Sequence, residues 1–182
     1  IYPNDNWRIV KDTAGGYGTG NNFGDNFLGK IMNFFVSKLI AMPPMSAIYV
    51  YSIIKRRGLN VEYSKKIPSK KELAKYDYII MPSSIIAHET EINVIKKLSE
   101  QEVKIFVIGI FANVKKDSYK FKNSFIITGE PESFFLESNL IKEELDKYFI
   151  SKESYFGKPL VNNLDELPFP NWDDYLKKYS LK

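Results

Sequence analysis

The chain has 182 residues, 44% of them hydrophobic and 15% aromatic, which is enough to bury the core of one full domain with an appendage. Its net charge is +4, and the basic residues are spread along the chain rather than gathered in one block, so we expect no nucleic-acid partner. The absence of cysteine excludes disulfides, thiolate zinc sites and iron–sulfur ligation by the chain's own residues.

The apolar runs of the chain are all shorter than the ~20 residues that a membrane-spanning helix needs. No signal-peptide pattern opens the chain either. We therefore expect a cytoplasmic protein without a membrane partner. The chain begins with Ile-Tyr-Pro rather than with Met, from which we expect a fragment of a longer protein.

The N-terminal part predicts a short strand followed by a glycine-rich loop. Arg8–Lys11 is β-compatible, and the loop behind it is TAGGYGTGNNFGD (Thr13–Asp25). The loop matches neither the dinucleotide fingerprint nor the phosphate-binding P-loop. Its backbone N–H groups suit a phosphate or an amide-rich ligand, and a loop that closes on a ligand or partner is an equally good interpretation.

The rest of the chain alternates between strand-like and helix-like patterns. The expected elements are a helix at 47–57 that ends at Gly58, strands at 59–63 and 76–81, a helix carrying Ile92, Ile95 and Leu98, strands at 103–108 and 124–128, and a helix at 132–149. Near-continuous apolar strands such as VKIFVI (Val103–Ile108) are typical of parallel sheets covered on both faces. We predict an α/β fold, a Rossmann-like or flavodoxin-like five-stranded parallel sheet of order 2-1-3-4-5 flanked by helices.

The C-terminal part predicts a stiff, extended segment. In DELPFPNWD (Asp165–Asp173), Pro168 and Pro170 fix their own φ and bias the preceding residues toward extended conformations. We expect a domain at 1–150 and an extended linker at 151–182. A tail packed on its own domain is the simpler alternative.

Ligands of open parallel sheets bind outside the carboxyl ends of the strands. The post-strand residues of interest are 14–24, 82–84, 109–112 and 129–132, and small residues stand at several of these strand exits. Small residues let a bulky ligand approach the backbone, although Gly109 and Gly129 are equally explained by tight turns. His88, the only histidine, and Glu91 are expected to be ordinary residues of a helix start.

Three segments then carry a resemblance to a known family. PPMSAIYVYSIIKRRGLNVEY (Pro43–Tyr63), ITGEPESFF (Ile127–Phe135) and LDELPFPNWDDY (Leu164–Tyr175) occur in this order. They resemble segments of the cobalamin-binding domain that precedes the barrel of cobalamin-dependent radical S-adenosylmethionine enzymes. The last of them is similar to that family's linker into the barrel, and KDTAGGYGTG (Lys11–Gly20) is similar to the first loop of some members.

The resemblance implies a cobalamin-binding module that orients the corrin and is not itself catalytic. The residues it implies around the cofactor are Ala14, Gly15, Gly16, Ser83, Ser84, Gly109, Ile110, Gly129 and Glu130. It implies that the iron–sulfur cluster and S-adenosylmethionine belong to a barrel C-terminal to this chain, whose parent enzyme would be a radical enzyme, with methyl transfer as one option. It implies no metal ligand from this chain.

Two departures from the family pattern keep an alternative open. The Asp-x-His-x-x-Gly signature would need His at Ala14 and Gly at Tyr17, so no histidine from this loop is expected on the cobalt. Ile110 stands where relatives often have Gly or Pro. The alternative is a cofactor-free interaction or substrate-capping domain that kept the fold. A flavodoxin-like or receiver-like domain fits less well, because no acidic pair ends the first predicted strand and no Lys follows the fifth.

Overall fold

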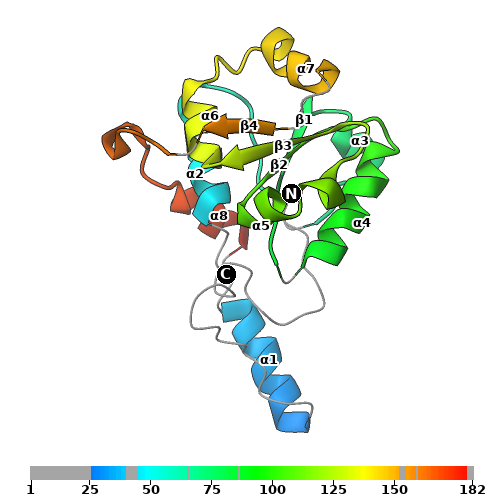
Figure 1. The fold of residues 1–182 in the computed structure, drawn as a ribbon. Helices are drawn as coiled ribbons and strands as arrows, with labels where there is room; N and C mark the ends of the chain where they lie inside the picture. Colours follow the sequence, from blue (N-terminus) through cyan, green and yellow to red (C-terminus); the bar gives the residue numbers. More distant parts are fainter. Residues whose placement is uncertain are drawn as a thin grey trace.

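The computed structural model describes residues 26–39, 45–64, 66–85, 87–151, 155–158 and 160–179, and these form a mixed α/β structure around an open parallel sheet (Figure 1). Its strands are β1 (Tyr78–Pro82), β2 (Lys104–Ile108), β3 (Ser124–Gly129) and β4 (Tyr155–Lys158), hydrogen-bonded in the order β1-β2-β3-β4. All three strand pairs are parallel. The predicted fold class, an α/β parallel sheet flanked by helices, is confirmed.

The strands form because their residues alternate between two hydrophobic clusters, one on each face of the sheet. Phe106 and Phe125 belong to one cluster, and Ile105, Val107 and Ile126 belong to the other. All five side chains are at most 2% exposed. A strand covered on both faces needs an unbroken apolar run, which is the pattern seen in β2 and β3.

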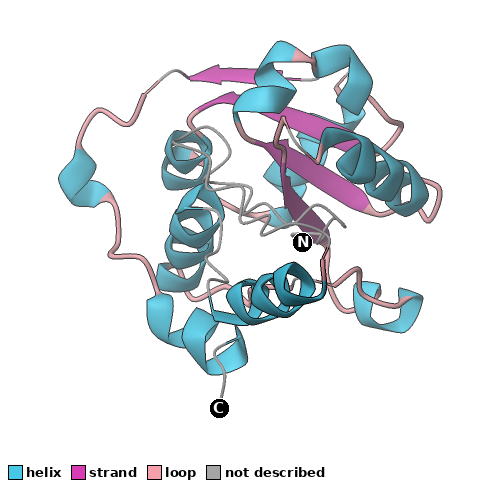
Figure 2. Ribbon diagram, turned by 90° about the horizontal axis from the view of Figure 1, so that it is seen from below, coloured by secondary structure: helices cyan, strands magenta, loops and turns pink. Residues whose placement is uncertain are grey.

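Helices cover both faces of the sheet (Figure 2). The cluster containing Phe106 is closed by α2 (Met45–Arg56), α6 (Pro131–Glu137) and α7 (Lys142–Ile150). The opposite cluster is closed by α3 (Lys70–Leu73), α4 (His88–Ser99), α5 (Ile110–Val114) and the 3-10 turn η2 (Lys116–Tyr119). The remaining described elements are α1 (Phe27–Leu39), the 3-10 turn η3 (Leu164–Glu166) and α8 (Trp172–Tyr179).

The five-stranded sheet of order 2-1-3-4-5 is not confirmed. Its third, fourth and fifth strands correspond to β1, β2 and β3, whereas residues 8–11 lie outside the described residues. The predicted strand at 59–63 is not formed: the segment pairs with no strand of the described sheet, and its contacts are made by side chains, with Val61 packed on the core and Tyr63 on Tyr175. In addition, β4 joins the edge of the sheet beside β3.

The helix predicted at 132–149 is divided into α6 and α7. Between them Leu140 adopts a positive φ of 54°, which ends any continuous helix. The end of α6 is capped from another element, since the guanidinium of Arg57 donates hydrogen bonds to the backbone carbonyls of Leu136 and Ser138. Arg57 is 81 residues away from Ser138 in the sequence. The pattern of apolar residues at 132–149 therefore could not reveal that the helix is interrupted.

Two aromatic side chains of the C-terminal segment differ sharply in exposure. Phe169 is 96% exposed, whereas Tyr175 on α8 is 4% exposed. The segment is tied back to α2, where Arg56 donates to the carbonyl of Glu166 at 2.6 Å and Ser52 Oγ accepts from the backbone N–H of Asn171 at 2.8 Å. The predicted boundary at residue 150 stays a prediction.

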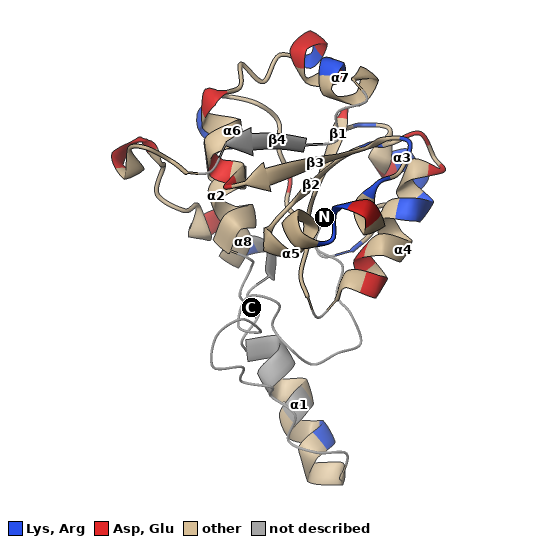
Figure 3. Cartoon of the chain, in the orientation of Figure 1, with Lys and Arg blue, Asp and Glu red and all other residues tan. Residues whose placement is uncertain are grey.

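Surface charge is mixed over the described residues. Figure 3 shows both basic and acidic residues on α4 and on α7. On α4 the first turn carries Glu89 and Glu91, and the last turn carries Lys96 and Lys97, an arrangement that matches the helix dipole. Among the described helices, none combines the length and the apolar character needed to cross a membrane.

Candidate functional site

The carboxyl ends of β1, β2 and β3 meet at one edge of the sheet, because the three strands are parallel and in register. This carboxyl edge carries six of the residues implied around the cofactor: Ser83, Ser84, Gly109, Ile110, Gly129 and Glu130. The other three, Ala14, Gly15 and Gly16, lie outside the described residues.

Ser83 and Gly109 are in direct contact at this edge. The N–H of Ser83 donates to the carbonyl of Ile108 at 2.7 Å, which extends the pairing of β1 and β2 by one residue. A Cβ placed on Gly109 would lie 2.9 Å from the carbonyl oxygen of Ser83, and its φ is 109°. Ser83 Oγ also accepts from the N–H of Ala112 at 2.9 Å, so it caps the start of α5. Glycine is therefore required here by the packing of the loop itself.

Ser84 belongs to a buried network that the sequence did not reveal. Its N–H and its hydroxyl donate to the two carboxylate oxygens of Glu91 at 2.9 and 3.0 Å. The hydroxyl of Tyr119, a residue of η2, donates to the same carboxylate at 3.0 Å. Glu91 and Tyr119 are both 0% exposed, and burial together with the charge of Glu91 raises the pKa of the Tyr119 hydroxyl. The network ties the loop after β1 to α4 and to η2.

Gly129 and Glu130 form the third loop of the edge. Gly129 has a φ of 82°, a conformation that glycine adopts without strain. Glu130 Oε2 accepts from the backbone N–H of Val161 at 2.8 Å, which attaches the C-terminal segment to the sheet. Next to it, burial and the charge of Glu130 raise the pKa of Glu132.

Further described residues near the carboxyl edge are apolar or aromatic: Ile110, Phe111 and His88. Ile110 is 83% exposed, so it projects from the loop instead of filling it. The ring of His88 lies 5.1 Å from that of Phe111, and His88 Nδ1 is 3.1 Å from the carbonyl oxygen of Ile85. The carbonyl can only accept, so this contact places a proton on Nδ1. His88 stands at the start of α4, as expected.

Comparisons of this chain with protein-family models, with curated proteins and with solved structures found no match. Within the described ranges, no group of three or more His, Asp or Glu side chains is arranged to hold a metal ion.

Proposed function

We propose that this chain is the cobalamin-binding module of a cytoplasmic radical S-adenosylmethionine enzyme and that the corrin lies against the carboxyl edge. The observation that carries the proposal is that the loops after β1, β2 and β3 share this edge. The ordered resemblance of three segments supports the choice of cofactor. When bound, cobalamin would supply a carrier for a methyl group, and the barrel beyond the chain would supply the radical.

The described residues fit a corrin held by backbone groups and apolar contact. Ser84 and Glu130 already hydrogen-bond within the protein, so their side chains are not arranged as ligands. Exposed Ile110 offers an apolar surface beside the glycine turn. The role of the module is thus to present a shaped edge rather than to coordinate the metal.

A second function, a cofactor-free interaction domain, is favoured by the exposure of two apolar residues on α5. Ile110 is 83% exposed and Val114, one turn later on α5, is 73% exposed. Exposed apolar residues that lie together on one helix are a common feature of protein contact surfaces. In that case the carboxyl edge would receive another protein, and the internal hydrogen bonds of Ser84 would serve only to hold its loop.

Retention of hydroxocobalamin during gel filtration distinguishes the two functions. We expect the 182-residue chain to elute with the cofactor's red chromophore, and Ile110→Glu to weaken retention because it places a charge on the apolar surface. Ile150→Glu is the matched control, since Ile150 is 81% exposed at the end of α7. Colourless wild-type protein, or equal loss in both variants, would contradict cobalamin binding at this edge.

A further inference from the structure

A pocket of about 180 Å³ lies between α2, residues 61–63 and α8, and none of the residues that line it belongs to the carboxyl edge. Five of its lining side chains are aromatic or acidic: Tyr51, Tyr63, Tyr175, Glu62 and Asp174. Neither Lys nor Arg is among the residues that line it. A pocket with this lining is suited to a cation.

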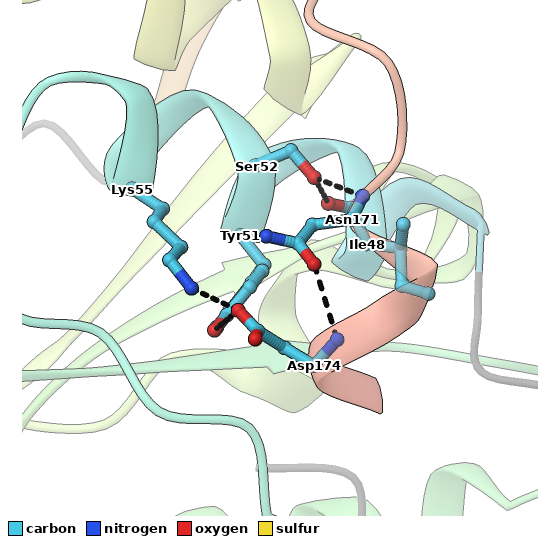
Figure 4. Close-up of polar contacts among 6 residues, drawn as sticks. All are labelled: Ile48, Tyr51, Ser52, Lys55, Asn171 and Asp174. Atoms are coloured by element: carbon cyan, nitrogen blue, oxygen red, sulfur yellow. Dashed lines mark hydrogen bonds and ion pairs between the residues drawn. The ribbon is translucent and has the colours of Figure 1, made fainter. Parts of the chain in front are cut away.

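The pocket has a fixed wall because α8 is held on α2 (Figure 4). Tyr51 donates to Asp174 Oδ2 at 2.9 Å, and the ammonium of Lys55 contacts the same oxygen. The side chain of Asn171 accepts from the N–H of Asp174 at 3.1 Å, while the backbone N–H of Asn171 donates to Ser52. These contacts fix the start of α8 and therefore the position of the Asp174 carboxylate.

Two aromatic rings provide adjacent walls. The ring centroids of Tyr63 and Tyr175 are 5.3 Å apart, and the ring planes are 85° to each other. Tyr175 is 4% exposed, so its ring is held by the surrounding structure. Perpendicular rings beside a carboxylate form the kind of cage that attracts alkylated ammonium ions, through the electron-rich faces of the rings.

The charges of the region favour a cation as well. Lys55 and Tyr51 hold the pKa of Asp174 below its usual range, so this carboxylate is ionised at neutral pH. Glu62 adds a second carboxylate to the pocket lining, whereas the positive charges of Lys55 and Lys177 act on Asp174 from outside that lining. Lys55 also lies 5.7 Å from the centre of the Tyr51 ring, so the protein already places one ammonium ion against this acidic and aromatic set.

We propose that this pocket binds a trimethylammonium group of a small organic molecule, with the rings of Tyr63 and Tyr175 around the methyl groups and the carboxylates of Asp174 and Glu62 supplying the opposite charge. This site is separate from the carboxyl edge and does not depend on the function proposed there.

Calorimetric titration of the 182-residue chain with choline tests the proposal. We expect saturable binding, and binding about tenfold weaker for 3,3-dimethylbutan-1-ol, which has the same shape without the charge. A parallel titration uses Nα-acetyl-Nε-trimethyllysine amide. Saturable binding of either cation supports the site, and the tighter one shows whether the group arrives on a free molecule or on a lysine side chain.

Two variants locate the binding. Asp174→Asn keeps the size of the side chain and is expected to weaken choline binding severalfold, whereas Asp173→Asn, its exposed neighbour, leaves binding unchanged. Glu62→Gln is expected to weaken binding without touching the contacts that hold α8. The proposal is overturned if neither cation binds saturably at tens of millimolar, if the neutral alcohol binds equally well, or if Asp173→Asn weakens binding as much as the two pocket variants.

Discussion

The carboxyl edge and the pocket beside α8 both contain a carboxylate held by hydrogen bonds, but in the pocket that carboxylate also lines a cavity. At the carboxyl edge, Ser84 and Tyr119 direct their hydroxyl groups onto the buried carboxylate of Glu91, where they hold the loop in place. At the pocket, the carboxylate of Asp174 accepts a hydrogen bond from Tyr51 and pairs with Lys55, and it also lines the cavity together with Glu62. The comparison teaches that residues found at the expected position in a fold can serve the fold, while a pocket can form from segments that no motif connects.

The largest expected effect comes from removing the buried carboxylate of the carboxyl edge. Glu91→Ala leaves the N–H of Ser84 and the hydroxyl of Tyr119 without their acceptor, and we expect a loss of about 4 kcal/mol and a fall in Tm of roughly 10 °C. Glu89→Ala, at an exposed position of the same helix turn, is the control and should change stability by less than about 0.5 kcal/mol. Equal melting temperatures for the two variants would show that the network does not hold the loop.

The next effect tests the aromatic wall of the pocket. Tyr175→Ala removes a ring that is 4% exposed and packed on Tyr63, so we expect a loss of about 3 kcal/mol in the free energy of unfolding. Phe169→Ala removes a ring that is 96% exposed and should be nearly neutral. Thermal melts of both variants decide this point. A neutral Tyr175→Ala would mean that α8 is not held on α2 in solution.

A smaller effect separates backbone strain from packing at the carboxyl edge. Gly109→Ala combines a φ of 109° with a Cβ 2.9 Å from the carbonyl oxygen of Ser83, and we expect a loss of about 2–3 kcal/mol. In Gly58→Ala the only penalty is the backbone strain of a φ of 76°, because no atom lies within 4 Å of the added Cβ. We expect this variant to lose about 1 kcal/mol in the free energy of unfolding. Urea unfolding measures both. If the two costs are the same, the contact with Ser83 contributes nothing.

The smallest effect is the pH dependence of the α8 contact. The folded-state pKa of Asp174 is lowered by Lys55 and Tyr51, so its contribution to stability is complete above the unfolded pKa, near 4, and is lost as pH falls through the folded pKa. When the pH is lowered from about 6 to about 3, the urea midpoint of unfolding should fall more steeply for the wild type than for Asp174→Asn. If the two proteins show the same dependence of the urea midpoint on pH, the ion pair between Lys55 and Asp174 does not stabilise the position of α8.

The sequence predicted the parts of the fold that depend on continuous apolar runs. β2 and β3 were expected at 103–108 and 124–128 and lie at Lys104–Ile108 and Ser124–Gly129. The break between α6 and α7 and the edge position of β4 were not expected, because they depend on contacts with distant residues.

In the two sites as well, the features that depend on contacts between distant residues could not be predicted from the sequence. Parallel topology was enough to bring Ser83 and Gly109 to one edge, since both follow parallel strands. No local pattern joins Tyr119 to Glu91 or Tyr63 to Tyr175, because each pair meets only after the chain has folded. Ser84 and Glu91 are seven residues apart, which is not the spacing of a capping box, so no local pattern pointed to their contact either.

The most direct test of the central claim is the amide NMR spectrum of the isotope-labelled 182-residue chain during titration with hydroxocobalamin. If the corrin lies against the carboxyl edge, the amide signals of Gly109, Ile110 and Gly129 shift or broaden in proportion to occupancy, while the signal of Asp174 stays in place. Perturbation centred on α8, or a spectrum unchanged at saturating cofactor, would contradict the proposal that the carboxyl edge is where this module holds cobalamin.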